Sequence, residues 1–208
     1  MRKIRKQMNA GALFWALVGA TFLPSFLFAQ TAANVSSNAQ LSTQIDIPPK
    51  DAYIAKFAVG ANGALHIAYS HGANVEIPRE RGRFSDGENT LTQEMFSDIQ
   101  LADDRRHIGW LAEYKICAQS YPCPAELVIY ESRQDLKHIT PPQGIVWRWR
   151  FLAGGKQVVL QYGFPHGDDV GVFALYDTAT GRRLSKFSST KKKFPKWVHQ
   201  LDPTVKAF

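Results

Sequence analysis

The residue types best suited to chemistry gather in one short segment of the chain, Tyr162–Asp169. Within it, His166 precedes two carboxylates, Asp168 and Asp169, and a glycine lies on either side of the histidine. An imidazole and two carboxylates on one loop are groups that hold a divalent cation or carry out acid–base catalysis. A Tyr-Ser-His-Gly segment places His71 on an earlier loop, so two histidines from equivalent units would face one site.

The same side chains also suit a loop between two strands, where polar residues and glycines serve turn geometry. One histidine with two aspartates falls short of the ligand set of known metal centres. We therefore predict that His71, His166, Asp168 and Asp169 are binding positions on loops, with no catalytic residue, metal or cofactor assigned. The alternative is a small secreted hydrolase or metal-dependent enzyme that uses His71, His166 and Asp168.

A second group of charged residues, Asp103–His107, combines two carboxylates, two arginines and a histidine. It is typical of a hairpin turn with local charge pairing. The sequence contains no Gly-x-Ser-x-Gly elbow, no phosphate-binding glycine loop and no paired zinc motif. These absences favour a binding protein over an enzyme of a familiar class.

The net charge of the 208-residue chain is +7, which raises the question of nucleic acid or an acidic membrane. Four basic residues lie within residues 1–7 and are followed by an uncharged apolar stretch over residues 10–29. This pattern predicts a secretory signal peptide over residues 1–29, cleaved after Ala29. An uncleaved anchor is the alternative, because about 20 apolar residues span a bilayer. Without residues 1–29 the chain keeps 21 basic and 18 acidic residues, a net charge of +3.

The two cysteines agree with export. Cys117 and Cys123 lie six positions apart, and prolines flank Cys123 on both sides. Their spacing differs from the two-residue gap of redox motifs. In an oxidising periplasm or exterior they are expected to form a structural disulfide that closes a short loop.

The apolar residues of the mature chain alternate with a period of two, which predicts strands. Ile108–Ile116 follows this pattern, and Trp147, Trp149 and Phe151 alternate with Arg148 and Arg150. The tryptophans are expected on a buried face and the arginines on the other, so base stacking on nucleic acid is not expected. The one helix predicted after the signal lies near residues 89–95.

The strands recur in three units, over residues 56–69, 99–110 and 149–160. Each unit contains a strand, a tight polar or glycine turn and a second strand. The turn dipeptides are Asn62-Gly63, Asp103-Asp104 and Gly154-Gly155. Asn-Gly and Gly-Gly favour two-residue hairpin turns, because a positive φ costs little there. The third unit continues into Leu175-Tyr176-Asp177 and Thr180-Gly181-Arg182.

This order of strand, hairpin, strand and Leu-Tyr-Asp-x-x-Thr-Gly-Arg resembles a blade of the TolB-like and WD-repeat β-propellers. The resemblance covers residues 145–188 and 97–139 and extends weakly to 53–77. Residues 97–200 also resemble a group of uncharacterised secreted bacterial proteins. Propellers close with about four or more blades. Three units imply an incomplete propeller, a sandwich-like arrangement of antiparallel sheets, or a homo-oligomer whose chains together complete a ring.

The predicted organisation is a signal helix over residues 1–29, a flexible lead over 30–51 and one all-β domain over 52–208. We expect an exported, non-catalytic binding protein of the bacterial envelope, periplasmic or secreted. Its predicted contacts are the loops at 70–83, 121–124 and 164–169, and its predicted partner is an envelope protein, a peptide or a glycan. No nucleic acid is expected, and a membrane only through an uncleaved N-terminal segment.

Overall fold

The computed structural model describes residues 51–86, 89–117, 121–131, 136–165, 171–188 and 193–204. The chain divides into two units between Ser42 and Thr43, and every described residue belongs to the second unit. The predicted signal peptide, and all of the predicted lead except Asp51, lie outside the described residues. Within the described ranges, no helix has the length and apolar character needed to cross a membrane.

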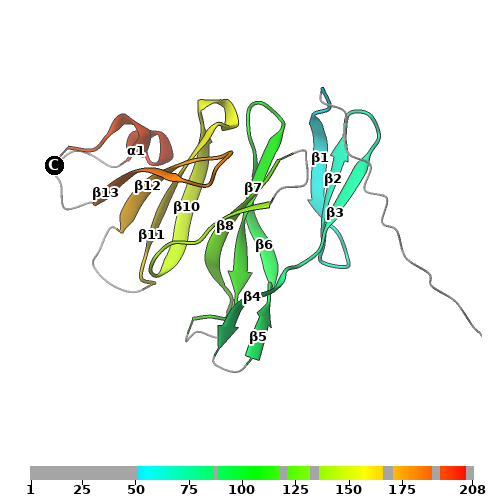
Figure 1. Ribbon diagram of the computed structural model, residues 1–208, viewed down its shortest axis with the longest axis horizontal. Helices are drawn as coiled ribbons and strands as arrows, with labels where there is room; N and C mark the ends of the chain where they lie inside the picture. Colours follow the sequence, from blue (N-terminus) through cyan, green and yellow to red (C-terminus); the bar gives the residue numbers. More distant parts are fainter. Residues whose placement is uncertain are drawn as a thin grey trace, which may run out of the picture. The chain divides into compact units, whose positions relative to one another are not determined.

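The described chain is dominated by antiparallel strands, which confirms the all-β prediction (Figure 1). Strands that follow one another in the sequence pair with one another, so each sheet is a meander. The first sheet contains β1 (Ile54–Val59), β2 (Leu65–Tyr69) and β3 (Asn74–Ile77). A two-stranded hairpin follows, formed by β4 (Arg81–Asp86) and β5 (Asn89–Thr92).

Two four-stranded sheets complete the fold. One contains β6 (Met95–Leu101), β7 (His107–Tyr114), β8 (Cys123–Glu131) and β9 (Leu136–Ile139). The other contains β10 (Ile145–Leu152), β11 (Gln157–Gly163), β12 (Val172–Asp177) and β13 (Arg183–Ser188). The short 3₁₀ helix η1 (Ala153–Gly155) connects β10 to β11, and the helix α1 (Lys196–Leu201) follows the last strand.

The first unit of the predicted repeat is out of phase with the other two. The Ile54 amide donates to the carbonyl of Arg105 (2.8 Å), so β1 begins at the end of the sheets that holds the β6–β7 turn. The β10–β11 turn lies at that same end, because a β-carbon on Gly155 would come within 2.6 Å of Asp104 Oδ2. The Asn62–Gly63 turn therefore lies at the opposite end. β1, β2 and β3 correspond to the second, third and fourth strands of the later sheets, and no described strand corresponds to the first.

The first sheet, the hairpin and the β6–β9 sheet share one hydrophobic core. Buried side chains such as Ile67 on β2 and Trp110 on β7 pack there, with Phe84 and Leu91 of the hairpin at the edge. A polar contact crosses the same core, since the Tyr69 hydroxyl donates to the Tyr130 hydroxyl (3.1 Å).

A second core lies between the two four-stranded sheets and includes Leu127, Trp149 and Leu160. Trp149 packs closely against β7, where Gly109 leaves room for its ring. A β-bulge between Val146 and Arg148 interrupts the predicted alternation. Trp149 is consequently buried, whereas Trp147 is half-buried beside Gly163 and Gly171.

The outer face of the last sheet is covered by the C-terminal segment. Phe194, Trp197 and Val198 pack there on Phe173 and Phe187. The arginines that alternate with the tryptophans lie on this side as well. Arg148 Nη1 is 2.6 Å from Asp202 Oδ2, and Arg150 Nη1 donates to the Gln200 carbonyl (3.1 Å).

The helix predicted near residues 89–95 is wrong. Residues 89–92 form β5, in which Thr90 pairs with Ser85 of β4. Residues 89–95 taken by themselves carry no information about β4, the preceding strand with which β5 pairs. The helix α1 was not predicted, because its six residues are too few to display a helical period.

Candidate functional site

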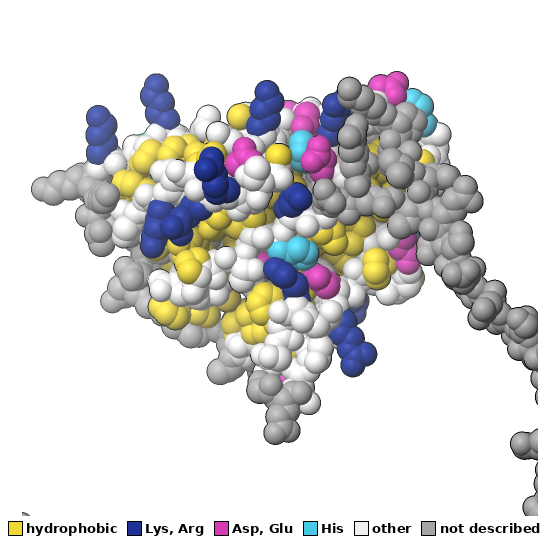
Figure 2. Space-filling view, in the orientation of Figure 1, with side chains coloured by type: hydrophobic (Ala, Val, Ile, Leu, Met, Phe, Trp, Pro, Cys, Tyr) yellow, Lys and Arg dark blue, Asp and Glu magenta, His cyan; other side chains and the backbone are white. Residues whose placement is uncertain are grey.

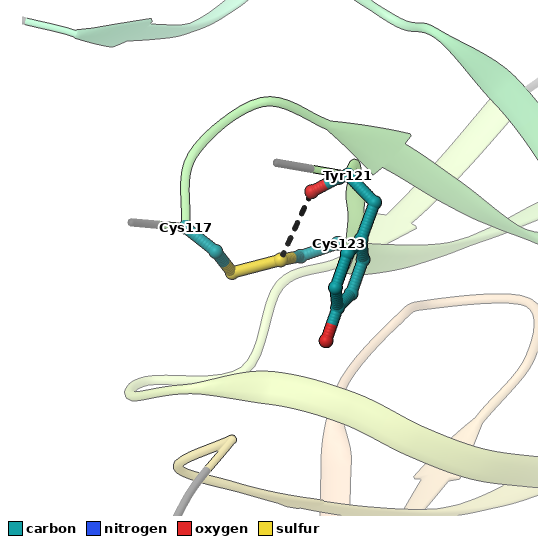
Figure 3. The surroundings of a disulfide bond; sticks show 3 residues. All are labelled: Cys117, Tyr121 and Cys123. Atoms are coloured by element: carbon teal, nitrogen blue, oxygen red, sulfur yellow. Dashed lines mark hydrogen bonds between the residues drawn. A yellow bond between two sulfur atoms is a disulfide. The ribbon is translucent and has the colours of Figure 1, made fainter. Parts of the chain in front are cut away.

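The predicted disulfide between Cys117 and Cys123 is present, with the two Cα atoms 6.2 Å apart. It closes the connection from β7 to β8, and Figure 3 shows Tyr121 beside it. The Tyr121 carbonyl oxygen lies 4.0 Å from the Cys123 sulfur. A disulfide sulfur carries no proton, so this is a contact and not a hydrogen bond. The disulfide is typical of proteins outside the reducing cytoplasm.

Two of the predicted contact loops extend from the same end of the sheets. β7 and β11 both begin at the end where Asp104 meets Gly155, and they run away from it (Figure 1). β7 leads to the loop with Tyr121, and β11 leads to the segment with Phe164. Tyr121 is 61% exposed and Phe164 is 60% exposed, the highest values among the large hydrophobic side chains described.

The four residues predicted as binding positions are only partly described. His71 lies on the exposed β2–β3 turn, where its Nδ1 is 3.0 Å from Ser70 Oγ and its Nε2 is 4.0 Å from Asp51 Oδ2. His166, Asp168 and Asp169 lie outside the described residues. The binding role of these four residues, and the alternative enzyme that would use them, therefore stay predictions.

The charged segment 103–107 forms the β6–β7 turn with the predicted local pairing. Asp104 accepts hydrogen bonds from the Arg106 and His107 amides, and its Oδ2 lies 2.6 Å from His107 Nδ1. Arg105 has a φ of 56° and donates from its guanidinium to the carbonyls of Ile54 and Ala55. These contacts link the turn to β1, which gives the charges a structural role.

Two shallow hollows occur among the described residues. One has a volume of about 210 Å³ and lies on the outer face of the first sheet, over small residues such as Ala58 and Ala68. The other, of about 370 Å³, lies between the end of β10 and α1, next to Asp103, Arg150 and His199. Neither brings together the residues predicted to bind.

A cluster of polar side chains surrounds the buried Glu126 on β8, a residue that the sequence did not single out. Glu126 is 0% exposed. Its Oε1 lies 3.2 Å from His138 Nδ1 on β9, and its Oε2 accepts from Thr140 Oγ1 (2.9 Å) and Arg83 Nη2 (3.2 Å). The β8–β9 register produces this meeting: it pairs Val128 with His138, which brings Thr140 opposite Glu126.

Glu80 joins the cluster from the start of the hairpin. Its Oε2 is 3.7 Å from His138 Nδ1, so the imidazole nitrogen lies between two carboxylates. Buried Gln93 fixes the backbone of Glu80 through two hydrogen bonds. The backbone amide of Gln93 donates to the Glu80 carbonyl (2.7 Å), and the side-chain oxygen of Gln93 accepts from the Glu80 backbone amide (3.4 Å). Near the centre of the face drawn in Figure 2, histidine, basic and acidic side chains lie next to one another.

Tyr114 supplies a further polar group beside the cluster. It is 0% exposed, and its hydroxyl has no hydrogen-bond partner among the described residues. It lies on the same face of the sheet as Glu126, because its neighbour two positions earlier, Ala112, pairs with Glu126. Its ring also packs on Phe84 of the hairpin, with the centroids 4.7 Å apart.

The charges in the cluster shift one another's pKa values. Burial acts to raise the pKa of the Glu126 carboxyl, but hydrogen bonds from His138, Arg83 and Thr140 outweigh it and hold that pKa below its ordinary value. The hydrogen bond to Glu126 raises the pKa of Arg83. Burial, followed by the negative charges of Glu126 and Glu80, raises the pKa of Tyr114. Glu126 is therefore ionised at neutral pH despite its complete burial.

One signal for this cluster was present in the sequence. Glu126 interrupts the apolar run of β8 and falls in phase with Val128 and Tyr130, which face the first core. A carboxylate on a buried face needs partners. The partners come from residues 80–83, which only the folded chain brings close.

Comparisons with known proteins add no name to these observations. No protein-family model matches the chain, and no curated protein matches its sequence.

Proposed function

We propose that the chain is an exported all-β binding protein of the bacterial envelope, without catalytic activity, whose partner is a protein or peptide. The proposed contact surface is the loop end of the sheets that carries Tyr121 and Phe164. The proposal includes a relationship of this chain to the TolB-like and WD-repeat β-propellers, and the two four-stranded meanders support that relationship. The disulfide supports export, because disulfides persist in oxidising compartments.

The exposure of Tyr121 and Phe164 carries the proposal. Both side chains are about three-fifths exposed, although the fold buries large aromatic residues such as Trp110 and Phe173 completely or almost so. Tyrosine and phenylalanine are enriched at the buried centres of protein interfaces. The disulfide restricts the loop of Tyr121, which lowers the entropy that binding would cost.

Position-specific photo-crosslinking tests this proposal. Three variants of the full chain carry p-benzoylphenylalanine in place of Tyr121, of Phe164, or of Leu184. Leu184 is the control, since it is 41% exposed but lies on the edge strand β13, away from these loops. The variants are produced in bacterial cells, irradiated and analysed by mass.

The expected result is an adduct of one defined mass at positions 121 and 164 that is absent at position 184. Equal adducts at all three positions, or none at positions 121 and 164, would contradict a protein-binding function for this loop end.

A further inference from the structure

We propose that Glu80, Glu126 and His138 form a binding site for a divalent transition-metal ion of the Zn²⁺ class. The three side chains offer one nitrogen and two carboxylate oxygens that all lie within 4.8 Å of one another. Imidazole nitrogen with carboxylate oxygen is a ligand combination that zinc takes in proteins. This site is separate from the loop end described above, and the proposal does not rest on the proposed function.

The distances between these atoms agree with a small tetrahedral ion. Zinc binds nitrogen and oxygen at about 2.0–2.1 Å, so two ligand atoms of a tetrahedral site lie about 3.3–3.4 Å apart. His138 Nδ1 is 3.2 Å from Glu126 Oε1 and 3.7 Å from Glu80 Oε2. The Glu80 and Glu126 oxygens lie within 4.8 Å of each other, so rotation of the partly exposed Glu80 side chain toward Glu126 would complete the tetrahedral arrangement.

The carboxylate of Glu126 is oriented in advance. Thr140 and Arg83 both donate to Oε2, which leaves Oε1 facing the imidazole of His138. Donors that hold the outer oxygen of a ligating carboxylate are a regular feature of metal sites, because they fix its orientation. The two hydrogen bonds between Gln93 and the backbone of Glu80 hold that backbone in place.

Tyr114 is independent support for a ligand. Its fully buried hydroxyl has no hydrogen-bond partner among the described residues, although it shares a sheet face with Glu126. Buried hydroxyls are regularly hydrogen-bonded, so such a group calls for an explanation. A water molecule bound to an ion in the cluster would provide that hydrogen-bond partner.

The charge balance also favours a cation. Two carboxylates, Glu80 and Glu126, and one guanidinium, Arg83, together carry a net charge of −1. Glu80 precedes β4 whereas Glu126 and His138 belong to the β6–β9 sheet, so one ion would link the hairpin to that sheet. Metal binding should consequently stabilise the fold.

Isothermal titration of the untagged, metal-stripped full chain with ZnCl₂ tests the proposal. We expect one zinc per chain and a loss of affinity of at least tenfold in Glu80→Gln and in His138→Gln. The matched control is Glu76→Gln. Glu76 belongs to an exposed pair with His66, 3.8 Å apart, on the first sheet. The Glu76→Gln variant should bind zinc with the same affinity as the unchanged chain.

Thermal unfolding gives a second readout. Zinc should raise the midpoint of the unchanged chain and of Glu76→Gln but not that of Glu80→Gln. If His138→Gln does not fold, Glu80→Gln decides alone, because its side chain is one-third exposed and its amide is nearly isosteric. Absence of one-site zinc binding, or binding that survives Glu80→Gln unchanged, would overturn the proposal.

Discussion

The hydroxyl of Tyr69 shows how one polar group can join two sheets. It donates to the hydroxyl of Tyr130 across the first core, and both side chains are almost completely buried. Burial, followed by this hydrogen bond, raises the pKa of Tyr69 far above its ordinary value. Burial raises the pKa of Tyr130 as well, so the folded state favours the neutral form of both hydroxyls.

Tyr69→Phe should lower the free energy of unfolding by about 1–3 kcal/mol, because it leaves the Tyr130 hydroxyl buried without its partner. The double variant Tyr69→Phe/Tyr130→Phe should cost less than the sum of the two single variants. Urea denaturation measures all three. Strict additivity would show that the two hydroxyls do not interact in solution.

Packing also predicts the effect of a substitution at Gly109. A β-carbon at this position would lie 2.6 Å from Trp149 Cη2 and 3.2 Å from the Val128 carbonyl oxygen. Gly109→Ala should therefore destabilise the fold by about 1–3 kcal/mol through overpacking. Combining it with Trp149→Phe should cost less than the sum of the two changes, measured in urea. An unchanged unfolding midpoint in Gly109→Ala would contradict the close contact between the sheets.

At the scale of elements, α1 is attached to the last sheet by apolar packing and by one carboxylate. Asp202 follows α1 and accepts from the Thr204 hydroxyl (2.6 Å) and the Arg148 guanidinium (2.6 Å). The hydrogen bond from the Thr204 hydroxyl has the largest effect on the pKa of Asp202 and lowers it. Desolvation raises this pKa, but the Thr204 amide and Arg148 lower it further, so it lies below its ordinary value. A lowered pKa means that the folded state favours the ionised carboxylate.

The stability that Asp202 contributes should therefore be fully present above its unfolded pKa of about 3.9 and be lost as the pH falls through its folded pKa. Asp202→Asn should be less stable than the unchanged chain at pH 7, and the difference should shrink in acid. Chemical denaturation at pH 7 and pH 3 measures it, with the exposed Asp86→Asn as control. A difference that stays constant with pH would argue against this linkage.

At the scale of the whole molecule, the disulfide reports both on stability and on compartment. A loop of this length gains about 2 kcal/mol from its cross-link in the chain-entropy description. Cys117→Ser/Cys123→Ser should lower the free energy of unfolding by about that amount, measured by denaturation without reductant. An equally stable double variant would show that the bond does not stabilise the fold.

Intact mass of the chain purified from the periplasm tests export directly. We expect a chain that lacks residues 1–29, because the signal pattern predicts cleavage after Ala29. Reduction should add two hydrogens as the disulfide opens. A full-length mass would favour the uncleaved anchor, and a mass unchanged by reductant would mean that the thiols are free.

The sequence predicted what depends on neighbouring residues. Alternation over Ile108–Ile116 predicted β7, and the dipeptides at Asp103 and Gly154 predicted where the β6–β7 and β10–β11 turns lie. The β10–β11 turn spans residues 153–156 and contains η1, so it is longer than the two-residue turn that Gly-Gly predicted. The sequence did not predict what depends on distant pairing. The phase of β1 is set by its contact with Arg105, the partner of β5 is β4, and the cluster around Glu126 draws on residues up to 60 positions apart.

The helix α1 and the first sheet give the two outer faces of the fold different prospects for assembly. α1 occupies the outer face of the last sheet, whereas no described element lies over Ala58 and Ala68 on the outer face of the first. Head-to-tail addition of copies, which builds rings and filaments, requires the two faces to meet. Because α1 occupies the outer face of the last sheet, that face is not free to pack on the first sheet of another copy in this way.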